Sequence, residues 1–149
     1  MNIALCSDEV YAVNDTVRQF LEAQGHTVQA FGSMDSQQTE AWADVTRSAA
    51  EAVAAGRCEE GVFFCWSGTG AAIVANKIPG IRAALCTDAE TAKAARLWNN
   101  ANVLVLSNRL TSPDLAKEIL EAWLNSVYDG RAANALKTIA ATEQRYFDK

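Results

Sequence analysis

Histidine is almost absent from this chain, with a single residue, His26, among 149. A zinc site built from several histidines is therefore excluded, as is any mechanism that needs two imidazoles. Four cysteines are present, but no two have the Cys-x-x-Cys spacing, so neither a zinc knuckle nor a thioredoxin-like motif is supported. Proline is also scarce, with two residues, so few positions forbid regular structure.

Long hydrophobic runs and an excess of positive charge are missing as well. No window approaches about eighteen consecutive apolar residues, so we expect no membrane span. Thirteen basic and eighteen acidic residues give a net charge of −5, which argues against nucleic acid as a partner. The first residues lack the basic start of a signal peptide, and the isolated cysteines suit a reducing compartment. We therefore expect a cytoplasmic protein.

Apolar runs alternate with amphipathic segments along the chain. The runs predict strands over residues 3–6, 27–31, 61–65, 82–86 and 102–106. Helical spacing and capping residues predict helices over about 15–24, 41–55, 71–76, 88–97, 111–124 and 132–147. Residues 32–39 are polar and indicate a turn. This alternation predicts an α/β fold: one Rossmann-like domain over 1–149, a three-layer α/β/α sandwich around a five-stranded parallel sheet.

The segment from Cys65 to Gly70 is the strongest candidate for a site. Ligands of open α/β sheets bind beyond the carboxyl ends of the strands, and here a predicted strand leads directly into a predicted helix. The sequence Cys-Trp-Ser-Gly-Thr-Gly lets the backbone bend, so that several N–H groups can converge on an anion. Taken alone, such a turn connects elements as often as it forms a site.

Single residues at the strand ends also have ordinary structural interpretations. Cys65 by itself is more often a buried thiol than a base. Asp8 is equally suited to capping the first helix, and Arg109 to being a solvated charge. His26 opens the second predicted strand, away from the carboxyl ends, and we interpret it as a surface or structural residue.

The stretch after this turn carries a family resemblance. Its most specific part is the sequence IVANKIPGIRAALC at residues 73–86, which together with Cys65–Gly70 resembles the type B ribose-5-phosphate isomerases and the galactose-6-phosphate isomerase subunits. The resemblance extends over essentially the whole chain through Ser7-Asp8, Asn99, Asn102-Val103-Leu104, Arg109 and Asp129-Gly130-Arg131.

This resemblance implies an enzyme that interconverts aldose and ketose phosphates through a cis-enediolate, with no metal and no cofactor. Cys65 would be the base that moves a proton between C1 and C2 of the sugar. Ser67 and the N–H groups of Gly68, Thr69 and Gly70 would stabilise the enediolate oxygen.

The resemblance also implies how the substrate is held. Asp8 and Asn99 would bind sugar hydroxyls, and Arg109 and Arg131 would meet the phosphate. Because the sites of the family use residues from two subunits, we expect at least a homodimer, with a tetramer as the larger alternative. We expect the C-terminal helix, about 132–147, to pack on the partner subunit.

The sequence departs from the family pattern at several site positions. Glu9 and Trp98 stand where the family has histidines, and Trp66 stands where it has glycine. Ala135 replaces an arginine of the phosphate grip, and Trp42 begins a segment that is Tyr-Pro-Asp in the family. The proton-transfer machinery is thus kept, while the ring-opening acid and part of the phosphate grip are lost.

These losses favour a small substrate. A tetrulose or tetrose phosphate that cannot cyclise needs no ring-opening acid, so Trp98 suits it, and we expect ribose 5-phosphate to be a poor substrate. We expect Glu9, Trp66 and Trp98 to contact the sugar, with the two indoles narrowing the pocket. Two alternatives stay open: a sugar-binding module with altered catalysis, and a partner subunit of a heteromeric isomerase.

Overall fold

Five parallel strands form one sheet in the order β2-β1-β3-β5-β4, in a computed structural model that describes residues 1–147. The strands are β1 Asn2–Ser7, β2 Thr27–Gly32, β3 Glu60–Cys65, β4 Ala83–Leu85 and β5 Val103–Ser107. Each lies where the sequence predicts it, within one or two residues at either end. The central strands β1, β3 and β5 are neighbours, so their carboxyl ends open onto the same edge of the sheet.

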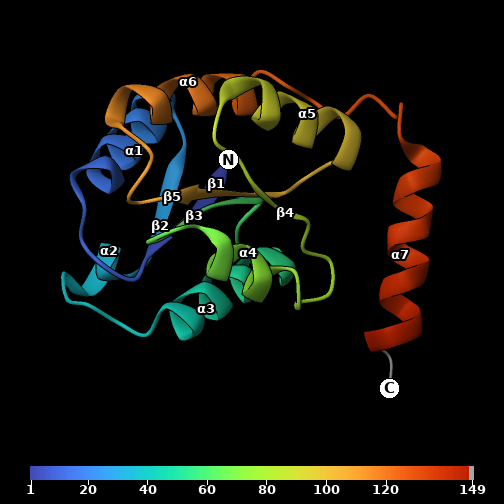
Figure 1. Cartoon of the computed structure of the whole chain (residues 1–149), viewed down its shortest axis with the longest axis horizontal. Helices are drawn as coiled ribbons and strands as arrows, with labels where there is room; N and C mark the ends of the chain where they lie inside the picture. Colours follow the sequence, from blue (N-terminus) through green and yellow to red (C-terminus); the bar gives the residue numbers. More distant parts are fainter. Residues whose placement is uncertain (148–149) are drawn as a thin grey trace.

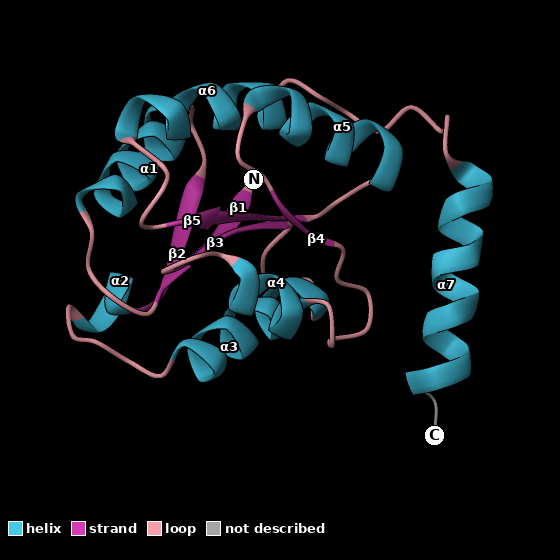
Figure 2. Cartoon of the chain, in the orientation of Figure 1, coloured by secondary structure: helices cyan, strands magenta, loops and turns pink. Residues whose placement is uncertain are grey.

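Helices cover both faces of this sheet, which confirms the predicted three-layer α/β/α sandwich (Figures 1 and 2). Helices α1, α5 and α6 lie on one face, and α3 and α4 lie on the other. The short α2 follows the edge strand β2, and its Met34 packs into the same half of the core as α1. The helices are α1 Ala12–Ala23, α2 Ser33–Ser36, α3 Trp42–Ala54, α4 Thr69–Ala75, α5 Ala89–Asn99, α6 Pro113–Leu124 and α7 Ala133–Phe147.

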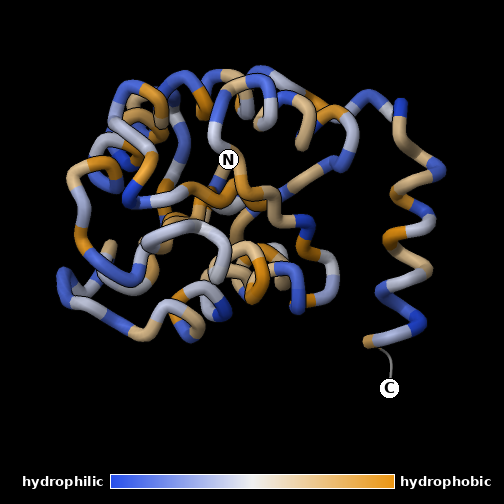
Figure 3. Tube along the Cα trace, viewed as in Figure 1, coloured by the Kyte–Doolittle hydropathy of each residue, from blue (hydrophilic) through white to orange (hydrophobic). Residues whose placement is uncertain are grey.

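The hydrophobic core has two halves, one on each face of the sheet. Successive side chains of a strand point to opposite faces. Val62 and Phe64 of β3 therefore pack with α1, α5 and α6, whereas Phe63 and Cys65 pack with α3 and α4. Because both faces are covered, every residue of β3 is buried, and the apolar colour concentrates at the centre of the molecule (Figure 3).

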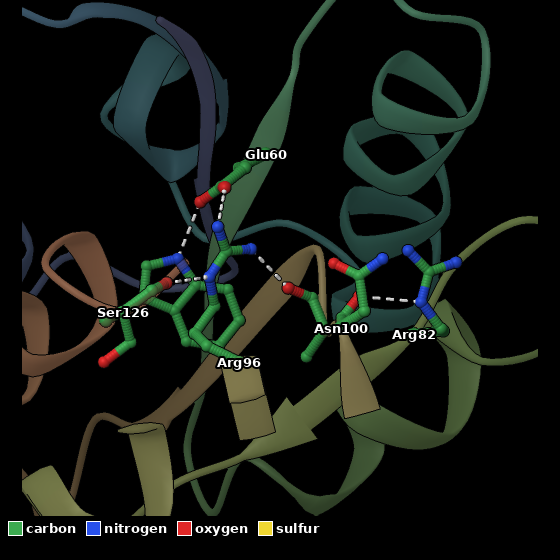
Figure 4. A network of polar contacts seen from close by, with 7 residues as sticks. Glu60, Arg82, Arg96, Asn100 and Ser126 are labelled. Atoms are coloured by element: carbon green, nitrogen blue, oxygen red, sulfur yellow. Dashed lines mark hydrogen bonds and ion pairs between the residues drawn. The ribbon is translucent and has the colours of Figure 1, made fainter. Parts of the chain in front are cut away.

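A buried ion pair fastens the amino end of β3 (Figure 4). Glu60 Oε1 lies 2.7 Å from Arg96 Nη2, and Glu60 Oε2 accepts a hydrogen bond of 2.7 Å from Trp123 Nε1. Arg96 also donates to the main-chain oxygens of Ala101 and Ser126, at 2.6 and 3.1 Å. The Glu60 carboxylate and the Arg96 guanidinium are thus paired with each other and hydrogen-bonded to further groups. These contacts join β3 to α5 and α6.

Local signals place most helix starts correctly. Asp88 accepts the N–H of Thr91, and Ser112 accepts that of Leu115, as expected of N-cap residues. One expectation was wrong: residues 32–39 contain the short helix α2 rather than only a turn. The side chain of Met34 is buried under β1 and α1, and one helical turn is too short to show a periodic pattern.

Helix α7 stands beside the open edge of β4, apart from the two helical layers (Figure 1). Its bounds agree with the predicted C-terminal helix, and none of its residues is buried within the described chain. The N–H of Gly80 donates to Glu143 Oε1 over 2.8 Å and ties the helix to the loop before β4. Among residues 1–147, no helix is both long and apolar enough to cross a membrane.

Candidate active site

A pocket of about 210 Å³ opens at the carboxyl ends of β1 and β3. It is lined by Asp8, Trp42, Cys65, Trp66, Ser67, Thr69 and Gly70. All of these except Trp42 are among the predicted site residues. The pocket therefore lies where open α/β sheets bind ligands, and it gathers the residues that follow β1 and β3.

Cys65 ends β3 and places its sulfur at this pocket. Its Sγ atom accepts a hydrogen bond of 3.2 Å from the main-chain N–H of Gly68. The other three cysteines lie in the apolar core, where burial raises the pKa of Cys6 and Cys58 and raises that of Cys86 to about 12. Cys65 is thus the cysteine that both lines a pocket and accepts a main-chain hydrogen bond at its sulfur.

The loop after Cys65 depends on two glycines. Gly68 has a φ of +82°, and a Cβ there would lie 2.5 Å from Leu85 Cδ1. A Cβ on Gly70 would lie 2.8 Å from the ring of Trp42. The absence of side chains lets the loop turn sharply under Trp42. The sequence reasoning directed the Gly68 N–H at the substrate, whereas in the structure it donates to Cys65.

Asp8 brings an unsatisfied carboxylate to the same pocket. Its Oδ1 atom is buried and has no hydrogen-bond partner in residues 1–147. Burial, and secondarily the charge of Glu9, raises the pKa of Asp8 above its usual value. Glu9 itself accepts a hydrogen bond of 3.0 Å from the Tyr11 hydroxyl. A buried acceptor without a donor is suited to receive a ligand hydroxyl.

Arg109 is held against the wall of the pocket by Trp66. Its guanidinium lies over the Trp66 ring, 5.1 Å from the ring centroid, and its main-chain N–H donates to the Trp66 carbonyl over 3.1 Å. The Ser107 hydroxyl donates to the same carbonyl over 2.8 Å. The loops after β3 and β5 are therefore joined, with a cation beside the cysteine loop.

The remaining predicted residues form a second group. Trp98, Asn99 and Arg131 line a separate cavity of about 550 Å³ at the start of α7. Arg131 lies over the Trp98 ring, 5.5 Å from its centroid, and pairs with Asp129 at 2.7 Å. A single chain thus divides the predicted site between two cavities. Within the described residues, no group of histidine, cysteine, aspartate and glutamate is placed to hold a metal ion.

Comparison with known proteins identifies this arrangement. A family model described as ribose/galactose isomerase matches residues 3–139. The chain belongs to this family. That membership confirms the resemblance found in the sequence.

Individual members of the ribose/galactose isomerase family agree over nearly their full lengths. The chain is 37% identical over 131 residues to D-erythrulose-4-phosphate isomerase of Pectobacterium atrosepticum, covering 87% of this chain and 86% of that one. It is 33% identical over 141 residues to ribose-5-phosphate isomerase B of Escherichia coli, with 94% of both chains covered. The structure of ribose-5-phosphate isomerase B from Clostridium thermocellum superposes with a TM-score of 0.90 at 36% identity, covering 98% of this chain and 99% of that one.

Family membership also confirms the predicted reaction class. The family and these relatives are sugar-phosphate aldose–ketose isomerases, so this chain is an isomerase as well.

Sequence reasoning missed three residues at or behind the pocket: Trp42, Asn14 and Asn108. Trp42 lines the pocket, and its place in a segment that differs from the family pattern was the available signal. Asn108 directly precedes Arg109 at the end of β5, a position where polar residues often serve a site. Asn14 lies on the buried face of α1 next to Val13, and a polar residue within an apolar stripe indicates a specific partner.

Proposed function

We propose that this isomerase converts an open-chain four-carbon ketose phosphate into the corresponding aldose phosphate, with Cys65 as the base. The observation that carries the proposal is one small pocket lined by both Cys65 and Asp8, whose Oδ1 atom has no hydrogen-bond partner in residues 1–147. The 37% identity to a D-erythrulose-4-phosphate isomerase supports the size of the substrate.

The chemistry of a tetrulose 4-phosphate agrees with the substitution at Trp98. The carbonyl of a tetrulose is at C2, so attack by O4 would close only a strained four-membered ring. In the four-carbon aldose product, the phosphate occupies the O4 that would close a five-membered ring, so both sugars stay open. No acid is then needed for ring opening. The indole N–H of tryptophan donates a hydrogen bond but does not titrate, so Trp98 cannot supply such an acid.

The proton transfer requires one base and a stabilised oxygen. The Cys65 thiolate removes a proton from C1, the C1–C2 bond gains double-bond character, and negative charge moves to the oxygen on C2. The Ser67 hydroxyl and the N–H groups of Thr69 and Gly70 stabilise that charge. The Cys65 thiol then returns its proton to C2, and a proton passes between the two oxygens. Asp8 accepts a hydrogen bond from a substrate hydroxyl throughout.

We propose further that the complete site forms between two copies of the chain in the cytoplasm. The Cys65 pocket of one copy would face the Trp98, Asn99 and Arg131 group of the other, with Arg109 and Arg131 meeting the phosphate. The separation of the two groups supports this arrangement, and so does α7, which has no buried residue in the single chain. A homodimer is the smallest assembly in which two copies of the chain can share a site.

Turnover of D-erythrulose 4-phosphate in deuterated water tests the reaction. We expect product to form with solvent deuterium at C2, and we expect Cys65→Ala to abolish both turnover and exchange. Cys58→Ala is the matched control, because Cys58 is buried away from the pocket, and it should keep full activity. Undiminished turnover by Cys65→Ala contradicts the mechanism, and efficient turnover of ribose 5-phosphate contradicts the proposed substrate size.

Mixing two inactive variants tests the shared site. Cys65→Ala and Arg131→Ala damage different groups, so a mixed dimer carries one intact site and one doubly altered site. Random reassociation of equal amounts should restore about one quarter of the wild-type activity. A mixture as inactive as its components would mean that each chain completes its own site.

A further inference from the structure

A chain of buried hydrogen bonds lies directly behind the pocket. The side-chain amide of Asn14 donates to Asn108 Oδ1 over 2.8 Å, and the Asn108 amide donates to Ser7 Oγ over 3.0 Å. Ser7, Asn14 and Asn108 are 0%, 1% and 6% exposed, so water does not compete for these groups. The chain crosses from helix α1 to the ends of β5 and β1.

Two members of the chain, Ser7 and Asn108, are hydrogen-bonded to main-chain carbonyls at or next to the proposed catalytic residues. The Ser7 hydroxyl donates to the Glu9 carbonyl over 2.6 Å and so shapes the turn that carries Asp8. The main-chain N–H of Asn108 donates to the Cys65 carbonyl over 2.9 Å. Asn108 is therefore bonded to the strand end that precedes Asp8 and to the residue that carries the thiol.

Each side-chain oxygen and nitrogen atom of Ser7, Asn14 and Asn108 has a hydrogen-bond partner. Asn14 Oδ1 accepts a hydrogen bond of 2.9 Å from the main-chain N–H of Tyr11. Both the oxygen and the nitrogen of the Asn14 amide are therefore hydrogen-bonded. A half-satisfied polar cluster in a dry interior is strongly destabilising, whereas a complete one holds its members in a single arrangement. Leucine at positions 14 and 108 has as many non-hydrogen side-chain atoms as asparagine but makes no directional bonds, so the gain from two amides is orientation.

We propose that Asn108 is a positioning residue that fixes the Cys65 thiol relative to the Asp8 carboxylate. It does not line the pocket, and it acts through its side-chain amide on Ser7 and through its main-chain N–H on Cys65. This inference rests on the proposed roles of Cys65 and Asp8 in the isomerisation.

Asn108→Ala separates positioning from binding. The variant removes the bond to Ser7 and leaves the Asn14 amide without its acceptor, so the turn at Asp8 can shift relative to Cys65. Because small misplacements of reacting groups affect the chemical step most, we expect kcat to fall about 10- to 100-fold and KM to change less. Ser7→Ala should reproduce this loss, and the double variant should lose less than the product of the two, because both act through one bond.

Trp123→Phe is the matched control. It deletes one buried side-chain hydrogen bond, from Trp123 Nε1 to Glu60, at the opposite end of β3. Urea denaturation measures the stability that each variant loses. A purely structural role for Asn108 predicts equal kcat for Asn108→Ala and Trp123→Phe once both are folded, and that result would overturn the proposal.

Hydrogen–deuterium exchange gives a readout that does not depend on the substrate. Asn108→Ala should accelerate exchange locally in peptides covering residues 5–10 and 64–70, whereas Trp123→Phe should leave these peptides at the wild-type rate. If the wild type converts no tetrulose phosphate, the proposed function fails, and local exchange still decides the positioning of Asn108. Unchanged exchange in both peptides would overturn it.

Discussion

The Sγ atom of Cys65 accepts a hydrogen bond from the main-chain N–H of Gly68, 3.2 Å away. The donor lies in a left-handed conformation, and the position has no space for a Cβ because Leu85 and the main chain of Leu106 surround it. Gly68 therefore has two effects: it allows the loop to turn, and its N–H donates a hydrogen bond to the sulfur of Cys65.

Gly68→Ala should disturb both properties. Alanine there must hold a strained left-handed φ, and its Cβ meets the main chain of Leu106 at 3.3 Å as well as Leu85 Cδ1. We expect the loop to shift in response, which moves the N–H away from the thiol. We expect turnover to fall about tenfold or more and the free energy of unfolding to fall by about 1–3 kcal/mol. Gly25→Ala is the control, because Gly25 has a φ of +85° but nothing within 4 Å of its Cβ. Equal turnover by the two variants would mean that the loop geometry does not serve catalysis.

Asp8→Asn should stabilise the protein while inactivating it. The folded state raises the pKa of Asp8, so folded chains hold its proton more tightly than unfolded chains do. The free energy of unfolding contributed by this group therefore falls as pH rises from the usual Asp value of 3.8 through the raised folded value, and it stays low above that. Asparagine is neutral throughout and avoids the loss.

Urea denaturation of wild type and Asp8→Asn across this pH range measures the effect. The variant should be the more stable protein at neutral pH, and the difference should vanish below 3.8, where Asp8 is protonated in both states. If the two proteins differed in free energy of unfolding by the same amount at all pH values, packing rather than the buried charge would be the cause. Turnover at neutral pH should be lost, because an amide binds a substrate hydroxyl differently from a carboxylate.

The sequence predicts the fold and the position of the pocket well, since both follow from local signals. Apolar runs such as the one ending at Cys65 mark strands, and the glycine loop that follows marks the site. The link between Asn14 and Asn108 could not be predicted in the same way. These residues are 94 positions apart, and a hydrogen bond between distant polar residues leaves no periodic pattern.

The division of the site into two groups was also beyond the residue pattern alone. Trp98 and Arg131 are predicted site residues with no spacing that relates them to Cys65. In the structure they contact each other and line their own cavity, because Arg131 begins the segment that leads into α7. In the proposed dimer, their arrangement relative to Cys65 depends on a second chain, so no residue spacing within one chain predicts it.

Removing one partner of the buried ion pair should affect stability without affecting catalysis. The side chains of Arg96 and Glu60 are 14% and 10% exposed, so Glu60→Ala leaves an unpaired cation in the interior. We expect the free energy of unfolding to fall by about 3–5 kcal/mol. Asp44→Ala breaks the exposed pair with Arg47 and should change it by less than about 1 kcal/mol.

Urea denaturation compares the two variants, and turnover is measured at a temperature where both are folded. Turnover per folded molecule should equal the wild-type value in each, because Glu60 lies at the amino end of β3, away from the pocket. If Glu60→Ala lost less free energy of unfolding than Asp44→Ala, the claim that burial makes the Glu60–Arg96 pair important would be contradicted. Replacing Glu60 and Arg96 together by apolar residues should be less damaging than Glu60→Ala.

Trp98→His should widen the substrate range. An imidazole at this position can donate a proton to a ring oxygen, which a five-carbon sugar phosphate requires and the indole cannot provide. Trp98→Phe is the control, because it keeps an aromatic face for Arg131 but supplies no acid. We expect kcat/KM for ribose 5-phosphate, relative to D-erythrulose 4-phosphate, to rise in the histidine variant alone. An equal rise in both variants would assign the restriction to the width of the pocket. The gain should also decline as pH rises through about 6.5, since only the protonated imidazole is the acid.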